Sequence, residues 1–216
     1  MKSRLGKLDR AAPIGLPGLA EPETMRHYVR LSSKNFGIDT GLFPLGSCTM
    51  KHNARLNEKM ARLPGFGDIH PLQPVSTVQG ALQVIDTLAH YLKELTGMPA
   101  VTMSPKAGAH GELAGMMAIK AALDAKGEGH RKVVLVPESA HGTNPATAAM
   151  LGLKVVVVDT DEHGNVNIDD LKAKAEQHRD ALSAIMITYP STHGVYEEGI
   201  RDICRIIHEN GGQEIG

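Results

Sequence analysis

Aromatic residues and cysteines are scarce in this sequence. It has no tryptophan, three phenylalanines and four tyrosines, so its core must be filled by aliphatic side chains and by its ten methionines. The two cysteines, Cys48 and Cys204, lie far apart without metal-type spacing. This argues against a disulfide framework or a zinc site, and both are expected to be thiols.

Long apolar runs and an excess of one charge are also missing. The net charge is −1 with both signs interspersed, so no basic stripe points to nucleic acid and no polybasic segment points to a membrane surface. The apolar runs are far shorter than the ~20 residues of a membrane span, and the first ten residues lack the apolar core of a signal peptide. We therefore expect a cytoplasmic protein whose partners are small anions or proteins.

What the sequence does contain is an ordinary globular composition, with 216 residues of which 42% are apolar and 22% charged. Residues 1–76 are expected to form an N-terminal arm and loops, because Pro and Gly interrupt them repeatedly. Short helices are predicted at 23–33 and around Leu56 to Leu63, and residues 64–74 are expected to be irregular. Residues 77–216 are expected to form a partial α/β domain.

Apolar residues at three- and four-residue spacing predict a helix over 77–96, with Gly97 as its C-cap. Strands and helices then alternate, and the later strands are continuously apolar. This pattern predicts a parallel sheet covered on both faces. The strands are expected at 100–103, 132–136, 154–158 and 184–188, and the helices from about 110 and at 145–151, 168–178 and 200–210.

A loop of very small residues, 104–109, leads into the helix expected from about residue 110. Gly108 and Gly111 let the backbone approach a ligand closely, and the positive end of the helix suits a phosphate. The loop lacks G-x-G-x-x-G and G-K-[ST], so neither nucleotide fingerprint is met. Two interpretations stay open here: an anion cradle, or small residues that only let a helix and a strand pack tightly.

Three loops that follow strands each carry a histidine beside glycine and hydroxyl residues: His110, His141 and His193. Ligands of parallel sheets bind at the carboxyl ends of the strands, so these loops predict one pocket. An ordinary surface histidine remains the alternative for each of them. No cysteine or carboxylate lies at metal-ligand spacing, so we expect no metal site.

Four segments together resemble the pyridoxal-phosphate (PLP) half of glycine dehydrogenase (decarboxylating), the P-protein of the glycine cleavage system. Where that enzyme is split into two chains, the similarity is to the N-terminal part of subunit 2. It runs in a consistent order from near residue 5 to Gln213. The four segments are GLFPLGSCTMKHN (41–53), GFGDIHPLQP (65–74), AGAHGELAG (107–115) and ESAHGTNPATAAMLG (138–152).

The resemblance implies the fold-type I architecture of PLP enzymes, here truncated, with an extended N-terminal arm. It also implies that the backbone around Gly108 holds the cofactor phosphate and that His141 stacks on the pyridine ring. Lys51 and His193 are the other catalytic candidates. The implied cofactor-binding residues are Gly108, Ala109, His110, His141, Thr143, Asn144, Thr188 and Ser191, and the implied substrate-binding residues are Ser47, Cys48, Thr49, Lys51 and His70.

Several of these residues have simpler interpretations. Cys48 is equally a small space-filling residue, Lys51 a solvated charge, and His70 a residue that only ties down its own loop. The implied activity is PLP-dependent decarboxylation of glycine with aminomethyl transfer to the lipoyl group of H-protein. The implied partners are subunit 1, H-protein and glycine, in an oligomeric assembly.

One departure from the family concerns the lysine that forms the Schiff base. In the family it follows a further strand beyond HENGGQ, whereas this sequence continues as Glu214, Ile215 and Gly216, which do not resemble that apolar strand. We therefore expect no covalent cofactor attachment and no complete catalysis by this chain alone. Two alternatives to a catalytic segment remain, namely a non-catalytic binding or assembly subunit and a nucleotide-binding α/β protein.

Overall fold

The computed structural model describes residues 8, 10–35, 37–41 and 52–215. Its backbone divides into two compact units, Met1–Phe43 and Pro44–Gly216. The first unit contains helix α1 (Glu21–Ser32), which confirms the helix expected there and begins two residues earlier. Its start is stabilised by Glu23, whose Oε2 accepts a hydrogen bond of 3.2 Å from the Ala20 N–H. The domain boundary expected after residue 76 stays a prediction.

The second unit begins with helices whose apolar side chains remain exposed. They are α2 (Arg55–Ala61), α3 (Pro64–Gly67), the 3₁₀ helix η2 (Val75–Thr77) and α4 (Gln79–Thr96). The expectation of irregular backbone over 64–74 is wrong at α3, because Pro64 at the first helical position favours a helical turn. Gly97 ends α4 with φ 69°, which confirms the predicted C-cap. No described helix is long and apolar enough to cross a membrane.

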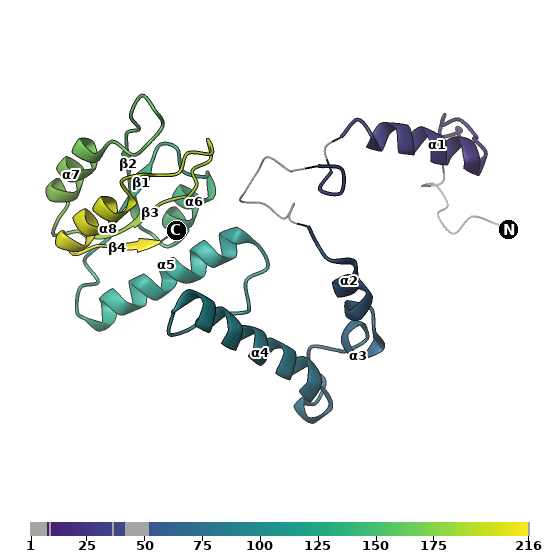
Figure 1. The fold of residues 1–216 in the computed structure, drawn as a ribbon, viewed down its shortest axis with the longest axis horizontal. Coiled ribbons are helices and arrows are strands. Elements are labelled where there is room, and N and C mark those ends of the chain that lie inside the picture. The colour runs from purple at the N-terminus through teal and green to yellow at the C-terminus, as the bar shows by residue number, and fades with distance from the viewer. Residues whose placement is uncertain (1–7, 9, 36, 42–51, 216) are drawn as a thin grey trace. The chain divides into compact units, whose positions relative to one another are not determined.

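A four-stranded parallel sheet forms the centre of the second unit (Figure 1). The strand order is β2-β1-β3-β4, and every neighbouring pair is parallel, as the apolar runs predicted. The strands are β1 (Val133–Pro137), β2 (Lys154–Val158), β3 (Leu182–Met186) and β4 (Gln213–Ile215).

One expected strand is absent from the described residues, and one observed strand was not expected. Residues 100–103 form no strand, because a short apolar run is stable as a strand only beside a partner strand and it has none in the described sheet. Conversely, Gln213–Ile215 does form a strand although its sequence is not apolar, since it pairs with Ala184–Met186 of β3 at the edge of the sheet. Pairing with an existing neighbour overrides local propensity here.

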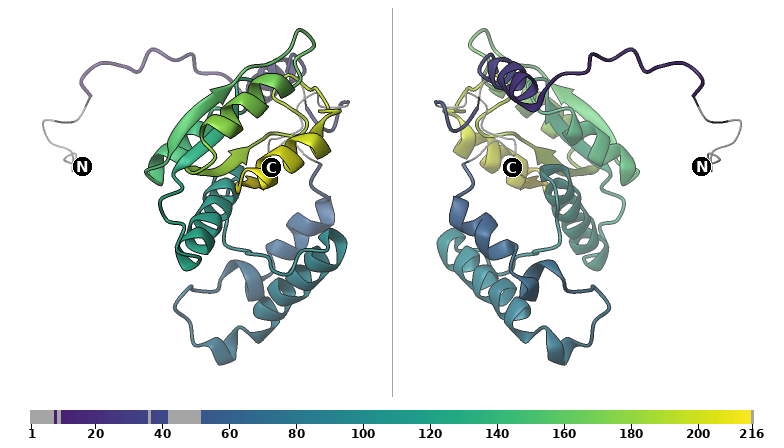
Figure 2. Two further views of the ribbon diagram at one scale, coloured as in Figure 1. Left: turned by 90° about the vertical axis from the view of Figure 1, so that its left-hand side faces the viewer. Right: turned by 90° about the vertical axis from the view of Figure 1, so that its right-hand side faces the viewer.

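Two helices cover each face of the sheet, as the turned views also show (Figure 2). Alternate residues of a strand point to opposite faces. Accordingly Val133 and Leu135 pack on one side and Val134 and Val136 on the other. The helices are α5 (Gly108–Ala125) and α6 (Thr143–Met150) on one face, and α7 (Ile168–Gln177) and α8 (Ile200–Glu209) on the other.

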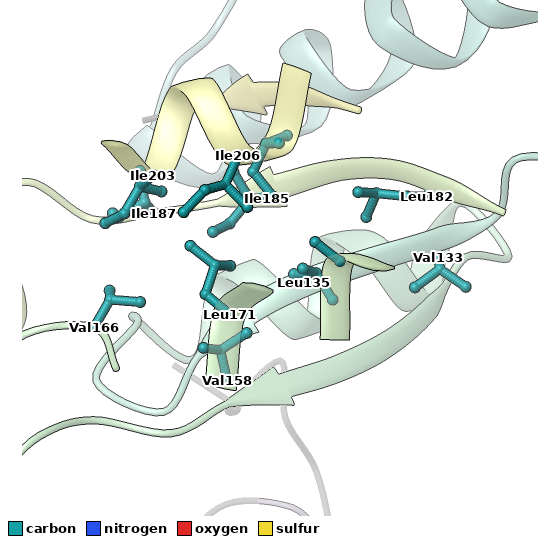
Figure 3. Close-up of a cluster of buried hydrophobic side chains, with 12 residues drawn as sticks. Val133, Leu135, Val158, Val166, Leu171, Leu182, Ile185, Ile187, Ile203 and Ile206 are labelled. Carbon is teal, nitrogen blue, oxygen red and sulfur yellow. The ribbon is translucent and has the colours of Figure 1, made fainter. Parts of the chain in front are cut away.

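The larger hydrophobic cluster lies between the sheet and helices α7 and α8 (Figure 3). Leu171 of α7, Ile185 of β3 and Ile203 of α8 are each 0% exposed. Among the described residues, none before Met116 is buried. The packed core is therefore built by the second half of the chain.

One half-buried ion pair links the end of β2 to the start of α7. Asp170 Oδ2 accepts hydrogen bonds of 2.7 Å from Lys174 Nζ and 2.8 Å from the Asp159 N–H. Burial by itself raises the pKa of Asp170, but these hydrogen bonds outweigh it and the pKa lies below its ordinary value. The bond to Asp170 correspondingly raises the pKa of Lys174.

We expect Asp170→Asn to lower the free energy of unfolding at neutral pH by about 1–2 kcal/mol, because two charge-assisted hydrogen bonds are lost. A carboxyl group with a lowered pKa contributes stability above its unfolded pKa, and this stability is lost as the pH falls through the lower folded value. Urea unfolding at several pH values measures this loss of stability. The matched control is Asp169→Asn, which changes an exposed carboxylate in the same helical turn. A difference from wild type that persists unchanged at about pH 2 would contradict this cause.

Candidate functional site

The polar side chains of interest gather where the parallel strands β1 and β3 end. A cavity of about 350 Å³ lies there, of the size that small-molecule sites have. Residues from four separate segments line it, including Gly108 of α5, Asn144 of α6, Thr188 after β3 and Ile215 of β4. The segments that follow β1 and β3 therefore meet at the carboxyl edge of the sheet, as parallel strand order requires, and the N-terminus of α5, which follows no described strand, also lines the cavity.

The N-terminus of α5 opens toward this cavity. Its N-cap, Ala107, is extended (φ −145°, ψ 161°) and has no side chain that could cap the helix. The first intrahelical acceptor, Ala107 O, bonds to the N–H groups of His110 and Gly111 at 3.0 and 3.4 Å. The N–H groups of Gly108 and Ala109 come before the first intrahelical hydrogen bond, so they have no acceptor within the helix. They lie at the positive end of the helix dipole, which suits an anion.

The glycines of α5 separate the two interpretations of this small-residue loop. A Cβ atom built on Gly108 or Gly111 would meet no atom within 4 Å beyond its chain neighbours and the backbone of α5 itself, so neither glycine is needed for packing. A Cβ on Gly115 would overlap the side chain of Ile215, so tight packing does explain that residue. Open space at Gly108 and Gly111 favours the cradle there.

His141 is oriented by a short hydrogen-bonded chain. Its Nδ1 lies 2.9 Å from Thr143 Oγ1 and accepts the Thr143 N–H at 3.2 Å. The Thr143 hydroxyl in turn donates to Glu112 Oε1 at 2.7 Å, and the His141 N–H contacts Thr188 Oγ1 at 3.5 Å. The ring is exposed while its Nδ1 edge is held in place, and neither His141 nor Thr143 is among the residues that line the cavity.

Other candidates from the sequence are occupied in their own loops. His110 Nδ1 accepts the Lys106 N–H at 3.1 Å, and His70 Nδ1 accepts the Leu72 N–H at 3.0 Å. The Ser191 hydroxyl accepts the N–H groups of His193 and Val195, both at 3.3 Å. The hydrogen bond of His70 agrees with the interpretation that this residue only ties down its own loop. None of these residues lines the cavity.

The substrate candidates Ser47, Cys48, Thr49 and Lys51 lie outside the described residues. Their roles stay predictions, as do those of the other site residues. Among the described residues no group of three or more His, Cys, Asp or Glu side chains could hold a metal ion.

A hollow of about 460 Å³ lies elsewhere, along α8. Its lining, from Ile200 to Glu209, comes from this helix alone, and its wall is largely open. A surface built by one helix brings no polar groups together from different segments, so the cavity at the strand ends is the better candidate.

Sequence reasoning overlooked Glu112. It lies four residues after Gly108 on α5, and this spacing places both residues at the same end and on the same side of a helix. That spacing is the signal that could have identified it. No comparable spacing in the sequence indicates that Met186, Ile187 and Ile215 form the apolar wall of the cavity.

The fold and the cavity define a class of protein. The chain shares a TM-score of 0.58 with sphingosine-1-phosphate lyase of Burkholderia pseudomallei, at 14% identity over 99% of this chain and 50% of that one. It shares a TM-score of 0.61 with the glutamate decarboxylase domain of a Vibrio parahaemolyticus protein, at 15% identity over 94% of this chain and 48% of that one. The chain thus has the α/β fold of fold-type I PLP-dependent enzymes, and it spans about half of each of these two solved chains.

Sequence comparison narrows this class. The chain is 64% identical to probable glycine dehydrogenase (decarboxylating) subunit 2 of Caulobacter vibrioides, over 97% of this chain and 39% of that protein. The Staphylococcus saprophyticus protein of the same name is 54% identical over 95% of this chain and 41% of its own length. Glycine dehydrogenase (decarboxylating) of Deinococcus radiodurans is 51% identical over 90% of this chain and 20% of its own length.

The chain is therefore homologous to a segment of glycine dehydrogenase (decarboxylating) subunit 2, and it spans about two fifths of the subunit 2 relatives. No family model matches the sequence.

Proposed function

We propose that this chain forms the PLP-holding part of a glycine decarboxylase, the P-protein of the glycine cleavage system. The overall reaction would be decarboxylation of glycine with transfer of the aminomethyl group to the lipoyl arm of H-protein. Subunit 1 and H-protein would be its partners in an oligomeric cytoplasmic assembly. The sequence identity to subunit 2 relatives supports this proposal.

The residues at the cavity fit the proposed cofactor. The N–H groups of Gly108 and Ala109 would bind the phosphate, because they lie at an uncapped helix N-terminus with open space beside Gly108 and Gly111. His141 would stack on the pyridine ring, while Asn144, which is 4% exposed, and Thr188 would present polar groups to its rim.

When bound, PLP supplies the electron sink for loss of the carboxylate. The protein's own contribution is orientation. A helix N-terminus and a stacked ring would hold the cofactor at two points, and the mostly apolar wall near Met186, Ile187 and Ile215 would keep water from one side of it. Lys51, His70 and His193 remain candidates for contact with substrate.

The single observation that carries the proposal is the meeting of Gly108, Asn144 and Thr188 around one cavity at the strand ends. If His141 stacks on the ring there, His141→Ala should weaken binding of pyridoxamine 5′-phosphate about tenfold, or about 1.4 kcal/mol. This probe carries ring and phosphate but no aldehyde, so it cannot react with surface lysines. Circular dichroism induced in its absorption band reports binding, because the free probe is achiral.

His178→Ala is the matched control, since His178 follows α7 at the opposite edge of the sheet. Equal affinity of the His141 and His178 variants would refute the stacking role. A non-catalytic binding or assembly subunit is the second candidate, and carbon dioxide release from glycine by the assembled system separates it from a catalytic segment.

A further inference from the structure

Among the described residues that line the cavity at the strand ends, Glu112 alone carries a charge. The other polar side chains there, which include those of Asn144 and Thr188, are neutral, and no lysine or arginine is among them. The cavity proposed to hold a phosphate therefore has a carboxylate in its wall and no cation to balance it. A phosphate bound there would meet a like charge as well as a helix N-terminus.

Glu112 lies at the same end of α5 as the proposed phosphate site. It follows Gly108 by four residues, which is about one helical turn, and helical side chains point back toward the N-terminus of their helix. Its Oε1 accepts a hydrogen bond of 2.7 Å from the hydroxyl of Thr143, at the start of α6. The carboxylate is thus held beside the cavity and is not free to turn away from a bound anion.

The negative charge of Glu112 has little compensation within the described part of the chain. Its Oε2 is buried and has no hydrogen-bond partner there, so the Thr143 hydroxyl is the one donor that these residues give to the carboxylate. No hydrogen bond or ion pair joins Glu112 to the titratable groups on its own segment or on the elements packed against α5. These groups are Lys106, His110, His141, Tyr189 and Glu214.

We propose that Glu112 couples phosphate binding at this cavity to the uptake of one proton from water. A phosphate monoester loses its second proton near about pH 6, so it is close to a dianion at neutral pH. A protein interior screens like charges poorly, so this dianion is repelled by the carboxylate. One proton held by the carboxylate and the phosphate together removes a unit of negative charge from the cavity. The inference rests on the proposed function for the place of the phosphate.

The coupling determines the sign of the pH dependence. Because a proton must accompany each phosphate, the affinity should fall as the pH rises above about 6, by up to about tenfold per pH unit. Without the carboxylate, the dianion binds to the helix N-terminus with no added proton, and its affinity should not depend on this titration. Glu112 would therefore set the pH range in which the chain takes up a phosphate ligand.

The test is calorimetric titration with pyridoxamine 5′-phosphate at about pH 7.5, above the second titration of a phosphate monoester. The cofactor-free chain is titrated in two buffers that differ in ionisation enthalpy, because the difference in heat counts the protons drawn from the buffer. Wild type should take up about one proton more than Glu112→Gln, since titration of the probe itself is common to both. From about pH 7 to about pH 8 the wild-type dissociation constant should rise about tenfold more than that of the variant.

Two further variants complete the test. Glu112→Met replaces the carboxylate by an apolar chain of similar length and should behave like Glu112→Gln. Glu138→Gln removes an exposed carboxylate that follows β1 and does not line the cavity, so it should keep the wild-type proton uptake. Binding with equal proton uptake by wild type and both Glu112 variants would overturn the inference and leave the proposed function intact. Absence of any binding to wild type would refute the proposed function, and the inference with it.

Discussion

Replacing both Gly108 and Gly111 by alanine is expected to weaken binding of pyridoxamine 5′-phosphate at least tenfold while leaving the chain as stable as wild type or more so. The two methyl groups would occupy the open space in which the phosphate is proposed to lie. Apart from the chain neighbours and the backbone of α5 itself, no protein atom lies within 4 Å of either Cβ position, so the added methyl groups meet no steric conflict. Alanine is also the better helix former by about 1 kcal/mol per site.

Two single-site controls accompany this double variant. Gly80→Ala also adds a methyl group to open space near the start of a helix, in α4, so it should gain the same helix propensity and leave the affinity unchanged. Gly212→Ala should destabilise the chain, because its Cβ would lie 2.9 Å from Ile207 Cγ2 and 3.1 Å from Leu182 Cγ. Chemical unfolding and the induced circular dichroism of the probe measure the two properties separately. An unchanged affinity of the double variant would contradict the proposed phosphate cradle.

The second large effect concerns the hydrophobic core. Leu171→Ala should lower the free energy of unfolding by about 3 kcal/mol, within the range of about 2–5 kcal/mol for a leucine removed from a packed core. Leu171 is 0% exposed and packs between α7 and the sheet among Val158, Ile185 and Ile203. The surrounding strands are held by main-chain hydrogen bonds, so they cannot collapse fully into the space left behind.

Leu95→Ala is the matched control, because it removes the same atoms from a helix where leucine is 83% exposed. Its effect should stay within about 0.5 kcal/mol. If both variants lost equal stability in urea unfolding, the conclusion that the core is confined to the second half of the chain would be wrong.

The α/β half of the fold could be predicted because the relevant signals are local. The continuously apolar segments 133–136 and 155–158 have no polar face, which predicts strands covered on both sides. The prediction holds fully for 133–136, whereas in the edge strand β2 only Val158 is buried and Val157 is 50% exposed. Gly97 and Asn167 mark helix ends by backbone freedom and by a capping side chain, respectively. The meeting of the segments that follow β1 and β3 then followed from parallel strand order, whereas the place of the loop before α5 did not, because no described strand precedes it.

The features of the fold and of the site that could not be predicted depend on contacts between segments far apart in the sequence. Residues 100–103 are apolar but form no strand, because no described strand pairs with them. Gln213–Ile215 is not an apolar run but forms a strand, because it pairs with β3. Glu112 was missed for a related reason, since its importance comes from Thr143, which lies 31 residues away in sequence. Hydrogen bonds of this kind leave no periodic pattern in a sequence.

The most direct test of the cradle compares two ligands that differ only in the phosphate. Pyridoxamine 5′-phosphate should bind to the chain at least tenfold more tightly than pyridoxamine, a difference of about 1.4 kcal/mol or more. Inorganic phosphate should compete with it, and the advantage of the phosphorylated ligand should disappear in the Gly108→Ala/Gly111→Ala variant. Equal affinity for the two ligands in the wild-type chain would contradict the claim that the N-terminus of α5 holds the phosphate.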